Sequence, residues 1–311
     1  MTSANRRHVF VCGLHRSGTS LIARSLAQHP QVSGFKNTGV IEDEGQFLQT
    51  VMPLEIAYGG VGRFGFDPRA HMTEASFFNR PENAQKLQAE WGRYWDPAKP
   101  VWIEKTPSNL LRMRLLAKLM APSYFVIVTR HPVAACLATL KWTEGNLFSL
   151  FAHWVHCYRI AQNDAGHLPH VIWTSYEDFV ARPEQALSRL LHFIGLQPAG
   201  KLPLAVSDEN EKYFKLWRER YFGDGNRAIE QLPPEHHRNL LTRTRDRLAR
   251  DRKEGALPFY RRKENLRSFR DALDAAALLE KDIQDFGYSF YDPQKSPQDA
   301  PRVHDVLATE I

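Results

Sequence analysis

The stretch CGLHRSGTSLI at residues 12–22 constrains the fold of this chain more than any other feature. Gly13 is followed by four residues, Gly18 and then Thr19-Ser20, which is the spacing of the phosphate-binding loop GxxxxGK[ST] without its lysine. The apolar run HVFVCG (8–13) predicts a buried strand before the loop, and the residues after Gly18 predict a helix that ends before His29-Pro30. The stretch is therefore either a chance match or a loop that holds a phosphorylated ligand other than a nucleoside triphosphate.

In this context, between a strand and a helix, the loop predicts an anion site. We expect the backbone N–H groups of Ser17, Gly18, Thr19 and Ser20 to converge on a phosphate together with the positive end of the helix. Arg16 stands near the position of the missing lysine, and its forked guanidinium suits a doubly charged anion without a metal ion. The alternative is a strand-to-helix turn with an incidental glycine.

The rest of the chain predicts an α/β fold. Further strands are expected at 101–105, 124–129 and 170–176, a short one within 31–35, and helices at 42–52, 81–91, 183–194 and from Pro107 to Met120. Strands that alternate with helices favour a central parallel sheet covered on both faces. The predicted fold class is a three-layer α/β/α arrangement, similar to P-loop nucleotide-binding proteins.

The domain organisation follows from length and composition. A chain of 311 residues with 43% apolar residues can bury one large core, so residues 1–286 are expected to form a single domain with a mostly helical part or cap at 200–286. Residues 287–311 are proline-rich and predict a peripheral or disordered tail. The apolar runs, such as 124–128, are too short to span a membrane.

Cysteine usage and charge limit the partners. Cys12, Cys136 and Cys157 lack metal-binding spacing, which favours a reducing compartment, the cytoplasm, and predicts no metal site. The net charge of +6 is concentrated at 237–270, where a solvated helix face is favoured over a groove for an acidic acceptor. No nucleic-acid-binding motif accompanies this charge, so nucleic acid is not expected as a partner.

Three further motifs follow the loop in a recognisable order: IEKTPSN (103–109), TRHPVAACLA (129–138) and TSYEDFVARPEQ (174–185). With them, residues 8–195 resemble the sulfotransferase superfamily that uses 3′-phosphoadenosine 5′-phosphosulfate (PAPS), and are similar to the heparan sulfate and tyrosylprotein sulfotransferases. The resemblance implies that Arg16 and Ser17 to Ser20 bind the 5′ end of PAPS, that Arg130 binds its 3′-phosphate, and that Tyr176 lies near the adenine. The family's serine is replaced here by Ala138, with Thr139 beside it.

The same resemblance suggests catalytic residues. Lys105, at the carboxyl end of a strand, would stabilise the negative charge that develops on the leaving oxygen, together with Arg16. Small-molecule members of the superfamily use a histidine where this chain has Pro107. The heparan sulfate enzymes instead use a glutamate ahead of an aromatic pair.

That glutamate is matched by the segment EDEGQFL at 42–48. Glu44 is therefore the candidate base, Glu42 is second, and His15 is a weaker candidate. The alternative reading of the segment is the acidic first turn of a helix, which the helix dipole favours.

Two other patterns are set aside. Gly60, Gly62 and Gly65 match GxGxxG, but no strand precedes them and a proline follows where a helix should begin, so a dinucleotide site is not expected. Trp91, Trp95 and Trp102 could stack on a sugar, although tryptophans spaced like these more often pack in a core.

The sequence thus predicts sulfuryl transfer from PAPS to a hydroxyl or amine of an acceptor, with carbohydrate favoured and no metal required. Two alternatives remain. One is an enzyme that uses a nucleoside triphosphate through a degenerate loop, although no aspartate for Mg²⁺ follows the predicted strands 101–105 and 124–129. The other is a non-catalytic module that binds the nucleotide. The sequence leaves the oligomeric state open.

Overall fold

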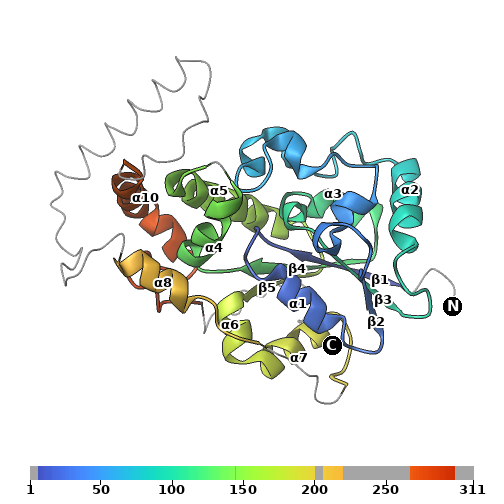
Figure 1. The fold of residues 1–311 in the computed structure, drawn as a ribbon. Helices are drawn as coiled ribbons and strands as arrows, with labels where there is room; N and C mark the ends of the chain where they lie inside the picture. Colours follow the sequence, from blue (N-terminus) through green and yellow to red (C-terminus); the bar gives the residue numbers. More distant parts are fainter. Residues whose placement is uncertain (1–5, 144, 200–205, 220–266, 298–311) are drawn as a thin grey trace.

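Five parallel strands form the centre of the protein, in the order β2-β3-β1-β4-β5 (Figure 1). This computed structural model describes residues 6–143, 145–199, 206–219 and 267–297. The strands are β1 (Arg7–Cys12), β2 (Val32–Gly34), β3 (Val101–Lys105), β4 (Ser123–Thr129) and β5 (Val171–Ser175). The predicted parallel sheet is confirmed.

The sheet is covered on both faces, as the apolar runs predict. Successive residues of a strand point to opposite sides, so Val9 and Val11 pack in one core and Phe10 and Cys12 in the other. Helices α1 (Thr19–Leu26), α6 (Tyr176–Ala181) and α7 (Pro183–Phe193) lie on one face (Figure 1). The opposite face carries α2 (Pro81–Gly92), α3 (Met113–Leu119), α4 (Pro132–Thr139), α5 (Leu147–Ala165) and α10 (Arg267–Gln284). The three-layer α/β/α fold is therefore confirmed.

The strand register brings the predicted motifs to one edge of the sheet. Val11 pairs with Lys105, and Cys12 pairs with Ile127 two residues before the end of β4. Because all the strands run in the same direction, the loop after β1 and the residues that follow β3, β4 and β5 leave the sheet on the same side. Open α/β sheets bind their ligands at this carboxyl edge.

The predicted helix at 42–52 is wrong. The chain forms two short 3₁₀ turns, η2 (Ile41–Asp43) and η3 (Gly45–Leu48), and Glu44 between them is extended. Tertiary acceptors take the N–H groups that a helix would use: Gly45 donates to the Glu104 carboxylate, and Gln46 donates to the Thr106 hydroxyl. The acidic segment is consequently not the first turn of an α-helix.

The predicted helix from Pro107 to Met120 is divided. Its first part is the 3₁₀ helix η7 (Pro107–Leu111), and α3 follows at Met113–Leu119. Sequence analysis also missed α5, whose buried residues occupy more than one face, so it lacks a clear amphipathic pattern.

Residues near the C-terminus that were expected to be peripheral pack against the domain. Helices α8 (Glu211–Trp217) and α10 are described within the part predicted to be helical, whereas residues 220–266, with most of the basic stretch, lie outside the described residues. Tyr288 and Phe290 are fully buried, and the Trp217 indole N–H donates to the Phe290 carbonyl. The packed region therefore extends past residue 287 into the segment expected to be peripheral.

Several residues that the sequence analysis did not assign to the site have structural roles. Trp91, Trp95 and Trp102 are buried and their rings contact one another, so they are core residues. All three cysteines are buried thiols. The GxGxxG stretch lies among the 3₁₀ turns η4 (Glu55–Tyr58), η5 (Phe64–Phe66) and η6 (Pro68–Ala70), and in this described part of the chain a 3₁₀ turn, not a strand, directly precedes it. Among the residues placed by the structure, no helix is long and apolar enough to cross a membrane.

Candidate functional site

A pocket of about 330 Å³ lies at the carboxyl edge of the sheet. Most of the predicted site residues line it together: Arg16, Gly18, Thr19, Ser20, Glu44, Arg130 and Tyr176. They come from the loop after β1, the 41–48 segment and the residues that follow β4 and β5. The fold therefore assembles in one cavity motifs that lie more than a hundred residues apart in sequence.

Gly18 shapes the floor of this pocket. Its φ of +95° lies in the left-handed region, and a Cβ there would lie 2.8 Å from Cδ2 of Tyr176, so only glycine fits without strain. Helix α1 begins at the next residue without a side-chain cap from the described part of the chain. Its first N–H groups, which have no acceptor within the helix, are thus available to an anion.

Ser17 lies behind the pocket and not in its lining. It is fully buried, its N–H donates to the Leu14 carbonyl, and its hydroxyl shares a 3.1 Å hydrogen bond with the Tyr158 hydroxyl. Tyr158 in turn donates to the Val128 carbonyl of β4. Ser17 therefore anchors the loop to the sheet and does not line the pocket.

Two arginines face the pocket from different elements. Arg130, at the end of β4, donates through Nε to Asn210 Oδ1 at 2.7 Å and through Nη1 to the Arg16 carbonyl at 2.9 Å. Its Nη2 and the Nε of Arg16 are buried and have no hydrogen-bond partner among the described residues. Burial lowers the pKa of Arg130, although nearby Tyr176 and Glu177 oppose this shift. Unpartnered buried guanidinium N–H groups favour an anionic ligand, because without one their desolvation is uncompensated.

Tyr176, the first residue of α6, supports the Arg130 end of the pocket. The Arg130 guanidinium lies 4.1 Å from the centre of its ring, a cation–π contact. Its hydroxyl donates to the Ser207 carbonyl at 3.0 Å and accepts from the Glu209 N–H at 2.9 Å. The tyrosine thereby joins the loop, Arg130 and the segment leading into α8.

The opposite end of the pocket carries an ion pair. The Lys105 ammonium lies 3.0 Å from Glu44 Oε1, and both side chains are about nine-tenths buried, at 8% exposure each. The other Glu44 oxygen accepts from Gln46 Nε2 at 2.7 Å. Lys105 itself does not line the pocket and reaches it through Glu44. Glu42, the second candidate base, is half-exposed and pairs with Arg24.

His15 is also part of the wall. Its Nε2 lies 3.0 Å from Glu55 Oε1, and this pair joins the Glu44 end through Gln46, whose Oε1 accepts from the Glu55 N–H. Ala138, at the position of the family's serine, is buried and has no hydroxyl. The hydroxyl of the neighbouring Thr139 donates to the Ala135 carbonyl at 2.7 Å. Neither residue lines the pocket.

Sequence analysis missed part of the wall. Trp142, half-exposed, lies 4.7 Å beneath the Arg16 guanidinium, and Lys212 and Tyr213 of α8 line the Arg130 end. Lys212 and Tyr213 lie outside the motifs named above. Their basic and aromatic side chains are the only feature of the sequence that could have indicated a role in binding an anion.

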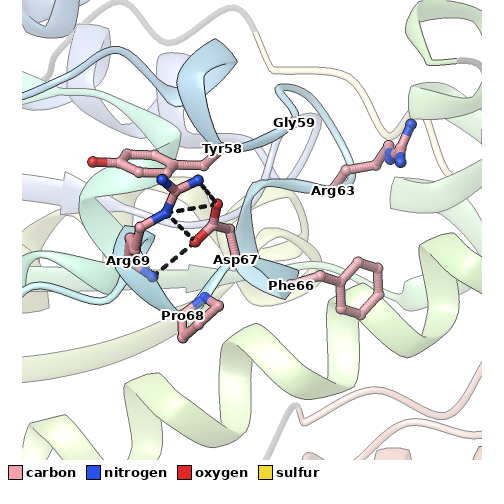
Figure 2. Close-up of a pocket in the computed structure, with 7 residues that line it drawn as sticks. All are labelled: Tyr58, Gly59, Arg63, Phe66, Asp67, Pro68 and Arg69. Carbon is pink, nitrogen blue, oxygen red and sulfur yellow. Dashed lines mark hydrogen bonds and ion pairs between the residues drawn. The ribbon is translucent and has the colours of Figure 1, made fainter. Parts of the chain in front are cut away.

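A second, shallower pocket of about 520 Å³ lies on the 58–69 segment (Figure 2). The Arg69 guanidinium donates to both carboxylate oxygens of Asp67, and this contact lowers the pKa of Asp67 to about 2. The ring of Tyr58 lies on the other side of Arg69, with 5.9 Å between the guanidinium and the ring centre. None of the residues predicted to form the site lines this pocket.

Comparison with known families identifies the class of protein. A sequence model described as "Sulfotransferase family" matches residues 8–199, more than half of the 311 residues. The matched region contains the loop, Lys105, Arg130 and Tyr176. The chain therefore belongs to the sulfotransferase family, and the predicted resemblance is confirmed. Comparison with curated protein sequences finds no match.

Solved sulfotransferase structures are similar to this one at low sequence identity. The sulfotransferase domain from the curacin biosynthetic pathway is 16% identical, with a TM-score of 0.42 over 65% of this chain and 79% of that one. The sulfotransferase domain from the Synechococcus PCC 7002 olefin synthase is 17% identical, with a TM-score of 0.41 over 73% and 91%. A sulfotransferase from Alicyclobacillus acidocaldarius is 16% identical, with a TM-score of 0.42 over 68% and 90%.

Proposed function

We propose that this sulfotransferase moves the sulfuryl group of PAPS to a hydroxyl or amine of an acceptor. The observation that supports PAPS most directly is the pair of buried, unpartnered guanidinium nitrogens, Arg16 Nε and Arg130 Nη2, in residues that line one pocket. PAPS is an adenosine nucleotide with anions at both ends of its ribose. Two arginines from different elements beside an uncapped helix N-terminus suit such a ligand.

The residues divide between the two ends of the nucleotide. Arg16 and the N–H groups of Gly18, Thr19 and Ser20 are proposed to hold the 5′-phosphosulfate, and Arg130 the 3′-phosphate. Tyr176 is proposed to lie near the adenine. Lys212 lines the same end of the pocket and forms an ion pair with Glu209, which also lines it.

Transfer would proceed by in-line displacement at the Glu44 end. The acceptor oxygen forms a bond to sulfur while the bond from sulfur to the bridging phosphate oxygen breaks. Arg16 stabilises the negative charge that develops on that bridging oxygen, and the Lys105 ammonium, which lies behind Glu44, adds positive potential there. Glu44 takes the acceptor proton; both of its oxygens already accept a hydrogen bond, but a carboxylate oxygen has a further lone pair.

The acceptor remains a prediction. Carbohydrate is favoured by the resemblance of IEKTPSN and EDEGQFL to the glycan-modifying enzymes. The pocket in Figure 2, which combines Tyr58 and Phe66 with Arg63 and Arg69, begins at the end of η4, the turn that starts at Glu55, the partner of His15. It is therefore the first place to examine for contacts with the rest of the acceptor.

A ligand-binding experiment tests the proposal. The product 3′-phosphoadenosine 5′-phosphate (PAP), at a hundred times its dissociation constant, should stabilise the protein by about 2.7 kcal/mol in thermal unfolding. ATP with Mg²⁺ should not, and the reverse result would indicate a nucleoside triphosphate enzyme. Incubation with ³⁵S-labelled PAPS and pooled glycans, lipids and peptides then separates an enzyme from a non-catalytic module, because only an enzyme labels an acceptor.

A further inference from the structure

Two buried carboxylates lie behind the pocket, one at each end, and neither lines it. Glu104, on β3, is 1% exposed and directly precedes Lys105. Glu177, on α6, is 9% exposed and directly follows Tyr176. Burying a carboxylate is costly unless it is well hydrogen-bonded, so each needs a physical explanation.

Glu104 holds the backbone of the Glu44 end. Its Oε1 accepts from the Gly45 N–H at 2.9 Å and from the Thr106 hydroxyl, and its Oε2 accepts from Asn109 Nδ2. The contact with Gly45 is close, because a Cβ on that residue would lie 2.5 Å from Glu104 Oε1. The bond fixes the peptide that follows Glu44, and so holds the Glu44 carboxylate against Lys105.

Glu177 holds the Arg130 end in a corresponding way. Its Oε1 accepts from the backbone N–H of His131 at 2.9 Å and from Asn210 Nδ2 at 2.7 Å, and its Oε2 accepts from the Tyr288 hydroxyl at 3.1 Å. The same Asn210 side chain accepts from Arg130 Nε. A continuous chain of hydrogen bonds therefore runs from Glu177 through Asn210 to the guanidinium.

In both networks, each carboxylate oxygen accepts at least one hydrogen bond. In each, donors face both oxygens, so a glutamine amide, which has one acceptor oxygen and no charge, fits only if the Tyr288 hydroxyl or the Asn109 amide reverses its role as donor. Burial raises the pKa of both carboxyls, that of Glu104 to about 7, while Lys105 and Arg130 respectively oppose the shift.

We propose that Glu104 and Glu177 are positioning residues with separate functions: Glu104 aligns Glu44 with Lys105, and Glu177 aligns Arg130 with the 3′-anion of the nucleotide. The part that concerns Glu177 rests on the proposed function, because it assumes that the ligand is PAPS. The part that concerns Glu104 rests on the ion pair alone. The two parts can therefore fail independently.

The test uses the full-length chain with Glu104→Gln and Glu177→Gln and measures two properties. One is the affinity for PAP, by calorimetry. The other is the rate at which an amine-acylating reagent labels Lys105, read by mass spectrometry relative to Lys118 on α3. Neither measurement needs the acceptor. Asp164→Asn is the matched control, since Asp164 is also buried but contacts His71 and Arg114 instead of the pocket.

The two variants should behave in opposite ways. Glu177→Gln is expected to weaken PAP binding about tenfold with Lys105 labelling unchanged, because a lost hydrogen bond to a charged group has about this effect. Glu104→Gln is expected to raise Lys105 labelling about tenfold with PAP affinity unchanged, because Glu44 no longer holds the ammonium in place. Asp164→Asn should change neither.

Several outcomes would overturn the inference. Parallel changes in both properties, or a uniform rise in the labelling of all lysines, would mean that the carboxylates only stabilise the fold. If Glu177→Gln does not fold, Asn210→Ala breaks the same link; if Glu104→Gln does not fold, Asn109→Ala removes one of its donors. If the parent protein binds no PAP, the proposed function fails, while the Lys105 measurement still decides the role of Glu104.

Discussion

The Lys105 ammonium and the Glu44 carboxylate lie 3.0 Å apart in a nearly dry ion pair at one end of the pocket. Lys105 ends a central strand, and Glu44 lies between two 3₁₀ turns of a loop. Removing one member of a buried pair leaves the other charge uncompensated, which is costly. Variants of this pair must therefore be judged on folding and on turnover separately.

Glu44→Gln should lower kcat by about 10²- to 10⁴-fold, the range for loss of a positioned base. PAP affinity should stay near that of the parent, because Glu44 lies away from Arg130. Rates with PAPS and calorimetry with PAP measure the two effects. Glu42→Gln is the control, since Glu42 is half-exposed and pairs with Arg24; a larger loss in that variant would move the base to Glu42.

Lys105→Met should reduce kcat by about 10²- to 10³-fold, as expected when a group that stabilises developing charge is removed. Its effect on KM should be small. The double variant with Glu44→Gln should lose less than the product of the two single effects, because the residues act as a unit. An increase in KM with kcat unchanged would show that Lys105 only binds substrate.

Arg130→Ala should weaken PAP binding by about 10- to 100-fold, the effect of losing charged hydrogen bonds to a phosphate. Binding of adenosine 5′-phosphate should hardly change, because that nucleotide lacks the 3′-phosphate. Arg24→Ala, which removes an exposed arginine on α1, serves as the control. Equal affinity of the parent protein for the two nucleotides would leave Arg130 without its proposed role.

Gly18→Ala should abolish PAP binding. The left-handed backbone alone costs about 1–2 kcal/mol with alanine. The new Cβ, 2.8 Å from Cδ2 of Tyr176, would also displace that ring from beneath Arg130. Gly92→Ala at the end of α2 meets no atom within 4 Å and should leave both folding and binding intact. Normal binding by Gly18→Ala would mean that the loop does not hold the ligand.

The pH dependence of stability should change in opposite directions in two variants. Burial lowers the pKa of His153 from 6.5 to about 3, so stability is lost as pH falls below 6.5, because only the unfolded chain gains that proton. Burial raises the pKa of Glu104 from 4.5 to about 7, so stability is gained as pH falls through that range.

Chemical unfolding between pH 5 and 6.5 measures both effects. Relative to the parent, His153→Gln should lower the slope of unfolding free energy against pH by up to about 1.4 kcal/mol per unit, and Glu104→Gln should raise it by up to about the same amount. Identical slopes in the parent and both variants would show that these two groups do not titrate differently on folding.

The sequence by itself determined the parallel sheet, the loop before α1 and the family. These depend on local patterns: apolar runs that form buried strands, a glycine at a left-handed position, and motifs that end strands at a common edge. Arg16, Arg130, Glu44 and Tyr176 could therefore be placed in one pocket before the structure was known, although their roles stay predictions.

Tertiary contacts decided the rest. Glu44 lies in an extended segment because Glu104 and Thr106 take the backbone N–H groups that a helix would have used. Ser17 turns inward because Tyr158, far away in sequence, offers a buried partner for its hydroxyl. Tyr288 is buried against Glu177 although its segment looks like a tail. In each case a long-range hydrogen bond in a dry interior outweighs the local preference of the chain, and no local pattern encodes which distant residue will supply the partner.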